Sequence, residues 1–235
     1  MQATREFNPK TDLPKDKSHF FSIVSGVRRS GKTVCTQALL KGPLHKRFHH
    51  TILISGTLEL HDQKEYFPTI PKSHRYTDGQ LSEVLHRVIE IQEQAIKKNR
   101  GKAKDILIVA DDVLDGSTRV KNSKALTKLA TLGRHLKVSV VMLVQHLVSG
   151  CNTAVRANAD LLFVFPTSSL KVLRFLTEEY LHYGSDGTLA SKRNAYEILH
   201  GIWTQDQYTC IVICSHLIGG ARSIRDFVFS YKAPL

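Results

Sequence analysis

The sequence contains little that would direct the chain into a membrane or an oxidising compartment. None of its apolar runs approaches the roughly 18 residues that a transmembrane helix requires, which argues against stable membrane insertion. Only four cysteines occur among 235 residues, and no C-x-x-C pair is present, so neither a zinc site nor a redox motif is indicated. We therefore expect an intracellular protein with reduced, partly buried thiols.

Acidic residues are also few relative to basic ones. The chain has 33 Lys and Arg residues against 21 Asp and Glu residues, which gives a formal net charge of +12. A positive surplus of this size in a compact domain favours a polyanionic partner such as nucleic acid. Charge alone does not establish that partner, because many basic proteins bind no nucleic acid.

The N-terminal 17 residues differ from the rest of the chain. They are polar, contain two prolines and lack the apolar segment of a signal peptide, so we expect a flexible or extended arm at residues 1–17. The chain as a whole is 42% hydrophobic and 23% charged, which is ordinary for a globular protein. Because no internal boundary is evident, we expect a single domain over residues 18–235.

One motif stands out against this background. Residues 26–33 match G-x-x-x-x-G-K-[ST], the phosphate-binding P-loop or Walker A motif, without mismatch. Its glycines bring backbone N–H groups close to phosphate oxygens, Lys32 can reach the β- and γ-phosphates, and the Thr33 hydroxyl can bind Mg²⁺. A buried strand at residues 20–25 and a helix at residues 34–41 provide the required context. We expect ATP and Mg²⁺ to bind at Gly26, Val27, Arg28, Arg29, Ser30, Gly31, Lys32, Thr33 and Val34.

Apolar runs and helical patterns alternate along the rest of the chain, which indicates a parallel sheet. Strands are expected at 51–55, 106–110, 138–144 and 161–165, and the last three are continuously apolar, as in strands that are covered on both faces. Helices are expected at 81–98, 123–132, 170–180 and 190–200. Two further strands, at 208–214 and 227–231, are expected to form an antiparallel edge, and residues 56–79 are expected to be a long surface connector. The sequence predicts an α/β fold with helices on both faces of a mostly parallel sheet.

The strand at residues 106–110 is followed directly by two carboxylates, as in a Walker B motif. Ligands bind at the carboxyl ends of strands in open α/β sheets. We expect Asp111 to hold Mg²⁺ and Asp112 to polarise the attacking water. The two side chains diverge because successive residues of a strand point to opposite faces, which suits two separate tasks.

The spacing of the two motifs indicates the type of P-loop fold. Lys32 and Asp111 are 111 − 32 = 79 positions apart, with a strand and a long helix between them. This interval leaves room for an extra strand between the two motif strands, as in the additional-strand, RecA-like P-loop NTPases. The strand at 138–144 ends at Gln145, whose amide can sense the γ-phosphate and orient water.

Two arginines are candidates for stabilising charge in the transition state of a neighbouring subunit. Arg134 precedes the strand at 138–144, and Arg156 follows that strand. A structural salt bridge or a DNA contact is an equally good interpretation of either residue. We prefer Arg134, because it lies before the strand, at the edge opposite the strand's carboxyl end.

Several segments together resemble the genome-packaging ATPases of large double-stranded DNA viruses, the poxvirus type, in the FtsK/HerA superfamily. They are residues 26–33, 54–57, 108–112, 134–145 and 155–160. The resemblance covers about residues 18–170, and it assigns Lys32, Thr33, Asp111, Asp112 and Gln145 the roles given above. Arg28 and Arg29 stand where many relatives have small residues.

The resemblance implies a ring-shaped motor, a pentamer or hexamer of this chain, that pumps double-stranded DNA into a capsid. It implies contacts with DNA that are not sequence-specific and a capsid or portal protein as a partner. It also implies a location in the host cytoplasm or viral factory, or in association with the virion. The candidate DNA-contacting clusters are Lys97, Lys98, Arg100, Lys102 and Lys104, and Arg119, Lys121, Lys124 and Lys128.

Two other functions stay open. The first is an ATPase of conjugation or filamentous-phage assembly, although its membrane-associated members usually carry an apolar anchor. The second is a DNA-associated protein that binds nucleotide and hydrolyses little, which the placement of Asp112 and Gln145 disfavours. A small-molecule kinase gives no reason for the positive charge.

Overall fold

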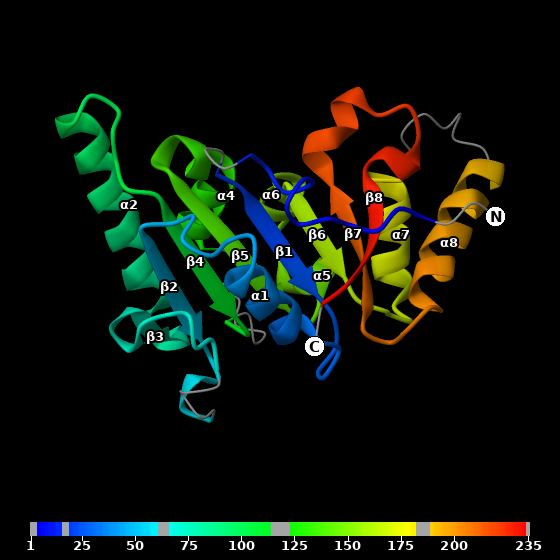
Figure 1. Cartoon of the computed structure of the whole chain (residues 1–235), viewed down its shortest axis with the longest axis horizontal. Helices are drawn as coiled ribbons and strands as arrows, with labels where there is room; N and C mark the ends of the chain where they lie inside the picture. The colour runs from blue at the N-terminus through cyan, green and yellow to red at the C-terminus, as the bar shows by residue number, and fades with distance from the viewer. Residues whose placement is uncertain (1–3, 16–18, 61–65, 114–122, 182–188, 234–235) are drawn as a thin grey trace.

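A single sheet organises the chain. The computed structural model describes residues 4–15, 19–60, 66–113, 123–181 and 189–233. Eight strands form the sheet in the order β3-β2-β4-β5-β1-β6-β7-β8 (Figure 1). Their bounds are β1 Phe21–Ser25, β2 His50–Ser55, β3 Arg75–Thr77, β4 Ile106–Asp111, β5 Val138–Val144, β6 Leu161–Val164, β7 Thr209–Cys214 and β8 Val228–Lys232.

The sheet is parallel from β3 to β6, and β7 and β8 are antiparallel to their neighbours. This topology confirms the expected α/β class, including the antiparallel edge formed by the last two strands. The helices are α1 Lys32–Lys41, α2 Leu81–Lys98, α4 Lys124–Leu136, α5 Leu147–Gly150, α6 Thr153–Ala157, α7 Leu170–Glu179 and α8 Leu189–Trp203.

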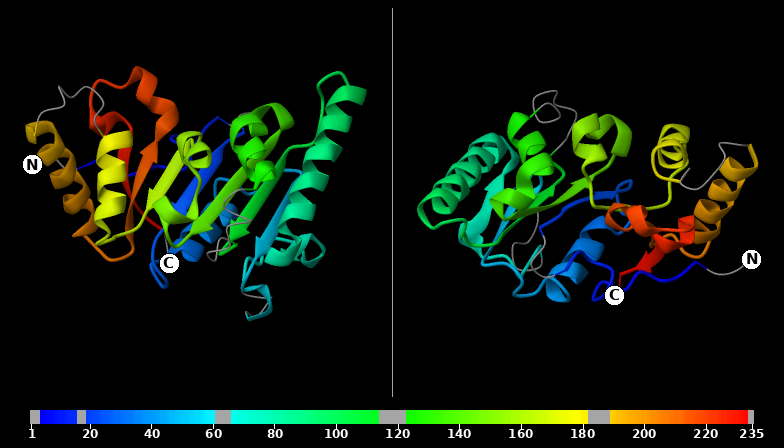
Figure 2. Two further views of the ribbon diagram at one scale, coloured as in Figure 1. Left: turned by 180° about the vertical axis from the view of Figure 1, so that it is seen from behind. Right: turned by 90° about the horizontal axis from the view of Figure 1, so that it is seen from above.

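Two hydrophobic cores cover the two faces of the sheet. Along β4, Ile108 packs into the core beneath α2, α4 and α7, whereas Leu107 and Val109 pack into the core beneath α1. The view from above shows α1 on one side of the sheet and α2, α4 and α7 on the other (Figure 2). Burial on both faces explains why the central strands are continuously apolar rather than alternating.

The extra strand between the two motif strands is β5. Met142 of β5 pairs with Ile23 of β1 on one side and with Ala110 of β4 on the other. β5 follows the Walker B aspartates in the sequence, whereas β2 and β3, which lie within the 79-residue interval, extend the sheet on the outer side of β4. The additional-strand arrangement is therefore present, but the interval between the motifs does not supply the strand that separates them.

The connector at residues 56–79 is more ordered than a surface loop. Residues 75–77 form β3, which extends the sheet in parallel beside β2. Tyr66, Phe67 and Ile70 are buried in the core on the α1 side. The prediction of a free surface connector is wrong for these described residues, because short apolar segments between prolines carry too little periodicity to reveal their burial.

The described part of the N-terminal segment, residues 4–15, packs against the domain. Phe7 is 2% exposed and makes an edge-on contact with Phe163, with ring centroids 5.5 Å apart. Its backbone N–H donates to Ser230 O of β8 at 2.7 Å. A flexible or extended arm was expected, and two apolar residues of this polar segment, Phe7 and Leu13, pack into the core.

The described residues bear on three expectations from the sequence, which concern the cysteines, membrane-spanning helices and metal sites. All four cysteines are described, and all four are buried and free, whereas only partial burial was expected. Among the described helices, none combines the length and apolar composition needed to span a bilayer. Within the same residues, no group of three or more His, Cys, Asp or Glu side chains could hold a metal by itself.

Candidate nucleotide-binding and hydrolysis site

The P-loop lies at the carboxyl edge of the sheet, between β1 and α1 (Figure 1). Its first residue continues the ladder, because Gly26 N–H donates to Val144 O of β5 at 3.2 Å. Ser55 of β2 pairs with Asp111 at the end of β4, so both strands end at this same edge. The parallel topology therefore gathers the loop and the Walker B carboxylates in one place.

The two glycines of the motif, Gly26 and Gly31, are required for different physical reasons. A Cβ at Gly26 would lie 2.5 Å from Ser30 Oγ and 2.8 Å from Phe165 Cβ, so any side chain there would clash. Gly31 has φ 101° and starts α1, a conformation that L side chains rarely adopt. Arg29 is also left-handed, with φ 61°, so the loop winds through two such residues around Ser30.

Lys32 is held inside its own loop. Its ammonium donates to Gly26 O at 2.7 Å and to Val27 O at 3.0 Å. Burial lowers the pKa of Lys32, and the carboxylates of Asp111 and Asp112 partly offset that effect. Phosphate oxygens would add further negative charge beside this half-buried ammonium, which suits Lys32 to anion binding.

Asp111 ends β4 and is 5% exposed. Tyr66 Oη donates to Asp111 Oδ2 at 2.5 Å, and Ser55 Oγ lies 2.9 Å from the same phenol oxygen. Burial and the charge of Asp111 raise the pKa of Tyr66, so the phenol stays protonated and can donate. The sequence analysis missed Tyr66, because a tyrosine in a connector 45 positions from its partner belongs to no motif.

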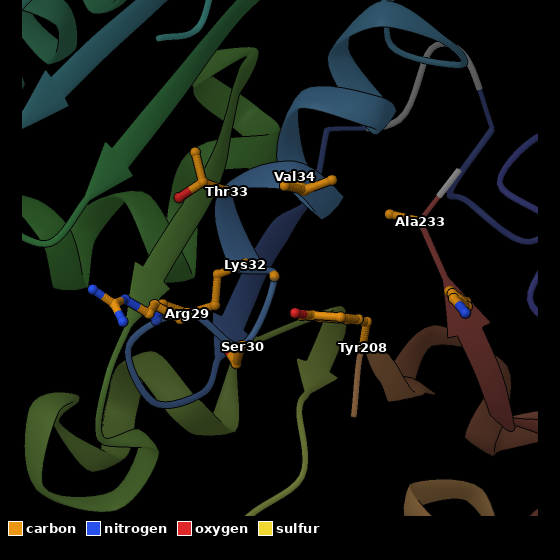
Figure 3. A pocket seen from close by; sticks show the side chains of 9 residues that line it. Arg29, Ser30, Lys32, Thr33, Val34, Tyr208 and Ala233 are labelled. Atoms are coloured by element: carbon orange, nitrogen blue, oxygen red, sulfur yellow. The ribbon is translucent and has the colours of Figure 1, made fainter. Parts of the chain in front are cut away.

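The donor set fits Mg²⁺. Asp111 offers a carboxylate and Thr33, in the first turn of α1, offers a hydroxyl, and both are the oxygen ligands that Mg²⁺ prefers. In Figure 3 the Thr33 hydroxyl points away from Val34, so these consecutive side chains serve different sides of the helix. A site with so few protein ligands would depend on phosphate oxygens and water to complete the shell.

Asp112 and Gln145 face each other from adjacent strand ends. Gln145 Nε2 donates to Asp112 Oδ1 at 2.9 Å and lies 3.2 Å from Oδ2. Asp112 has φ 52°, a left-handed backbone conformation directly after the end of β4. A Cβ at Gly56 would lie only 2.8 Å from Asp112 O, so the glycine permits this close approach. The structure thus brings the two predicted residues into direct contact.

The two candidate arginines both bind groups of their own chain. Arg134, in the last turn of α4, forms an ion pair with the buried Asp160, which also accepts from Phe21 N–H at the start of β1 at 2.8 Å. This places Arg134 at the amino edge of the sheet, opposite the P-loop, with its side chain 66% exposed.

Arg156 is bound more extensively. Its guanidinium donates to Cys151 O, to Val148 O at 2.8 Å, and lies 5.1 Å from the ring centroid of Phe175. These contacts join α5, α6 and α7. The structure therefore gives Arg156 a structural role and leaves Arg134 as the more exposed of the two.

A cavity of about 500 Å³ opens beside the P-loop (Figure 3). Its volume lies in the range of ordinary small-ligand sites. The sequence analysis named the P-loop wall but missed Tyr208 and the end of β8, because no motif links them to the loop. The cavity is lined by Arg29, Ser30, Gly31, Lys32, Thr33, Val34, Tyr208, Lys232 and Ala233.

The described residues of the two basic clusters lie toward opposite edges of the sheet. The first, residues 97–104, follows α2 toward the amino edge, and all five of its lysines and arginines are exposed. Arg119 and Lys121 of the second cluster lie outside the described residues. Lys124 begins α4, and Lys128 donates to Glu93 Oε1 at 2.5 Å.

Comparison with solved structures shows the same fold in other P-loop proteins. The genome packaging NTPase B204 of Sulfolobus turreted icosahedral virus 2, in complex with AMPPCP, is 15% identical, with a TM-score of 0.58 over 97% of this chain and 100% of that one. The pCW3 conjugation coupling protein TcpA, with ATPγS, is 12% identical, with a TM-score of 0.58 over 92% of this chain and 60% of that one.

Sequence comparison identifies the family. Uncharacterized protein 015R of Frog virus 3 is 25% identical over 213 residues, which are 90% of this chain and 61% of that relative. The model of the poxvirus A32 protein family matches residues 8–178. The resemblance to the poxvirus type is confirmed, since this match includes the P-loop, the Walker B strand, Gln145 and both arginines. The chain belongs to the poxvirus A32 protein family.

Proposed function

We propose that this chain is an ATP-hydrolysing motor that moves double-stranded viral DNA into a capsid as a ring of five or six subunits. The observation that carries the proposal is the pairing of Asp112 with Gln145 beside the P-loop. A protein that only binds nucleotide has no need of a carboxylate held at the tip of a strand next to the phosphate site. Its place of action would be the host cytoplasm or viral factory.

Each residue has a task that follows from its position. The backbone N–H groups of residues 26–33 and the ammonium of Lys32 bind the phosphates of ATP. Thr33 and Asp111 would hold Mg²⁺, which neutralises charge on the phosphate oxygens when bound. Asp112 accepts a proton from the water that attacks the γ-phosphorus, as the bond to the bridging oxygen breaks. Gln145 holds Asp112 and can follow the γ-phosphate.

Arg134 is the better candidate for acting on a neighbouring subunit. Its guanidinium is largely exposed at the edge opposite its own P-loop, so a subunit beside it in a ring can meet it. Arg156 would have to leave two backbone carbonyls and the Phe175 ring to do the same. A guanidinium that arrives from outside adds positive charge only when subunits assemble.

Translocation requires many weak contacts with DNA that do not depend on the DNA sequence. Lysine and arginine contacts to phosphates have this character, and the net charge of +12 supplies them. The exposed cluster at residues 97–104 is available for DNA or for the capsid partner. A conjugation-type ATPase stays the second candidate, because the fold shared with TcpA serves that process equally well.

The experiment that tests the proposal measures steady-state ATPase activity with and without long double-stranded DNA, for the wild type and for Asp112→Asn. We expect DNA to stimulate the wild type and the variant to lose at least about 100-fold in turnover. If DNA does not change the ATPase rate of assembled rings, the result would contradict a translocating motor. Absence of hydrolysis in the wild type, with ATP binding intact, would favour the nucleotide-binding alternative.

A further inference from the structure

Part of the cavity beside the P-loop is not explained by phosphate binding. Beyond the loop, its wall is formed by Val34, Tyr208, Lys232 and Ala233. Val34 is 45% exposed and Tyr208 is 42% exposed, so both side chains offer surface to a ligand in the cavity. Figure 3 shows the Tyr208 ring edge-on below the space, with Val34 above it and Ala233 at the side. The opening between them is therefore a slot with an aromatic floor.

The floor of the slot is continuous with the P-loop. A Cβ built on Gly31 would lie 3.5 Å from Tyr208 Cδ1 and 3.3 Å from Phe165 Cε1. The glycine thus brings the phosphate-binding backbone against the edge of the aromatic ring. A ligand whose anionic end sits on the loop would have its other end over Tyr208.

Tyr208 sits on a braced turn. Asp206 Oδ1 accepts from Tyr208 N–H at 2.7 Å, and Asp206 Oδ2 accepts from Lys232 Nζ of β8 at 2.8 Å. Asp206 O also accepts from Thr209 N–H at 3.0 Å, where β7 begins. One carboxylate therefore joins the turn that carries the ring to the end of the neighbouring strand. Because the backbone of the turn is held in this way, only the side-chain torsions of Tyr208 remain to be ordered when a ligand stacks on its ring.

We propose that Tyr208 is the platform on which the base of the bound nucleotide stacks, with Val34 and Ala233 covering the base from the other side. The inference rests on the proposed function for the phosphate end of the site. Stacking on an aromatic face recognises the flat surface of a base, and purines offer the larger surface. The site would hold the triphosphate by charge and the base by its ring face.

The test separates the two ends of the nucleotide. Affinities of the full chain for ATPγS and for inorganic tripolyphosphate are measured by calorimetry, for the wild type, Tyr208→Ala and Tyr208→Phe. We expect Tyr208→Ala to weaken ATPγS binding about tenfold and to leave tripolyphosphate binding unchanged, because base stacking contributes on that order. Tyr208→Phe keeps the aromatic face and should bind ATPγS within about twofold of the wild type.

A matched control is Tyr196→Ala on α8, whose side chain is similarly exposed at 41% and lies outside the cavity. We expect it to bind both ligands as the wild type does. Unchanged ATPγS affinity in Tyr208→Ala would overturn the base platform while leaving the P-loop function intact. Equal loss of both ligands would also overturn it, since Tyr208 would then only support the loop. Failure of the wild type to bind either ligand would contradict the proposed function itself.

Discussion

Tyr66 Oη donates a 2.5 Å hydrogen bond to the carboxylate of Asp111, across 45 positions of the sequence. Charge-assisted hydrogen bonds of this kind fix the orientation of a carboxylate more strongly than neutral ones. The expected Mg²⁺ ligand is therefore positioned by a side chain from the connector that precedes α2. Tyr66 touches no reacting atom in this arrangement and acts through Asp111.

Removing the hydroxyl group of Tyr66 should disturb the metal site and little else. In Tyr66→Phe the ring stays buried, but Asp111 loses a donor whose hydrogen bond contributes about 1.5 to 3 kcal/mol. We expect a rise of about tenfold in the Mg²⁺ concentration that gives half-maximal ATPase activity, with a smaller change in ATPγS binding measured without metal.

The control for this change is Tyr76→Phe on β3, which removes the hydroxyl of a half-buried tyrosine elsewhere in the same connector. It should leave the Mg²⁺ dependence at the wild-type value. An unchanged Mg²⁺ dependence in Tyr66→Phe, with a lowered melting temperature, would show that the hydrogen bond serves stability alone.

Asp112 and Gln145 should behave as one unit. Asp112→Asn keeps a residue type that tolerates the left-handed backbone at φ 52°, whereas Asp112→Ala adds backbone strain of roughly 1 kcal/mol. The asparagine variant is therefore the cleaner probe of chemistry. We expect Asp112→Asn to lower turnover at least about 100-fold and Gln145→Ala about tenfold, with ATPγS affinity retained in both.

The double variant tests the coupling between these two residues. Because Gln145 donates to the Asp112 carboxylate, its removal should cost little once that carboxylate has been neutralised. Turnover of the double variant should therefore equal that of Asp112→Asn alone. Losses that simply multiply would mean that Gln145 acts independently on the phosphate.

Substitution of the two arginines by alanine should lower the stability of the protein by different amounts. Arg134→Ala should lower the unfolding free energy by about 1 kcal/mol, because its guanidinium is 66% exposed and the buried Asp160 keeps its bond from Phe21 N–H. Arg156→Ala should cost about 2 kcal/mol, because two backbone carbonyls lose their donor. Urea unfolding of both variants measures the difference.

Mixing variants tests which arginine acts on a neighbour. Lys32→Ala subunits cannot use ATP but keep Arg134, and Arg134→Ala subunits have the reverse defect. If Arg134 completes the site of the next subunit, mixed rings should recover part of the ATPase activity that each variant lacks alone. Recovery in mixtures with Arg156→Ala instead would assign the role to Arg156.

His19 should make stability depend on pH. It is buried before β1 with Nε2 3.0 Å from Asp105 Oδ1, and burial lowers its pKa more than Asp105 raises it. Lys137 and Arg47 lower the pKa further. The folded state therefore prefers neutral imidazole. As the pH falls below the ordinary value of 6.5, the unfolded chain binds more protons, so the unfolding free energy should decrease.

The measurement compares melting temperatures at pH 7.5 and pH 5.5. His19→Gln should lose less stability over this interval than the wild type, because a neutral amide takes up no proton. His86→Gln, which replaces an exposed histidine of α2, should retain the wild-type decrease. A decrease of equal size in His19→Gln would assign the pH dependence to other groups.

The sequence by itself determined the elements whose signals are local. The glycines and lysine of residues 26–33, the apolar run that ends at Asp111, and Gln145 at the tip of its strand were predicted in place, because each signal lies within a few residues. The continuous apolar strands likewise predicted burial on both faces. The hydrogen bond between Asp112 and Gln145 was not predicted, although both residues were expected at the ends of strands.

Only the tertiary structure decided what depends on contacts between distant segments. It placed β5 rather than β2 between the motif strands, inserted Phe7 into the core, and brought Tyr66 to Asp111 and Tyr208 to Gly31. A single aromatic residue in a loop has no periodicity, and its partner is selected by the packing of the whole sheet. Local sequence therefore specified the phosphate-binding chemistry, while long-range packing selected the side chains that position the carboxylate and line the far end of the cavity.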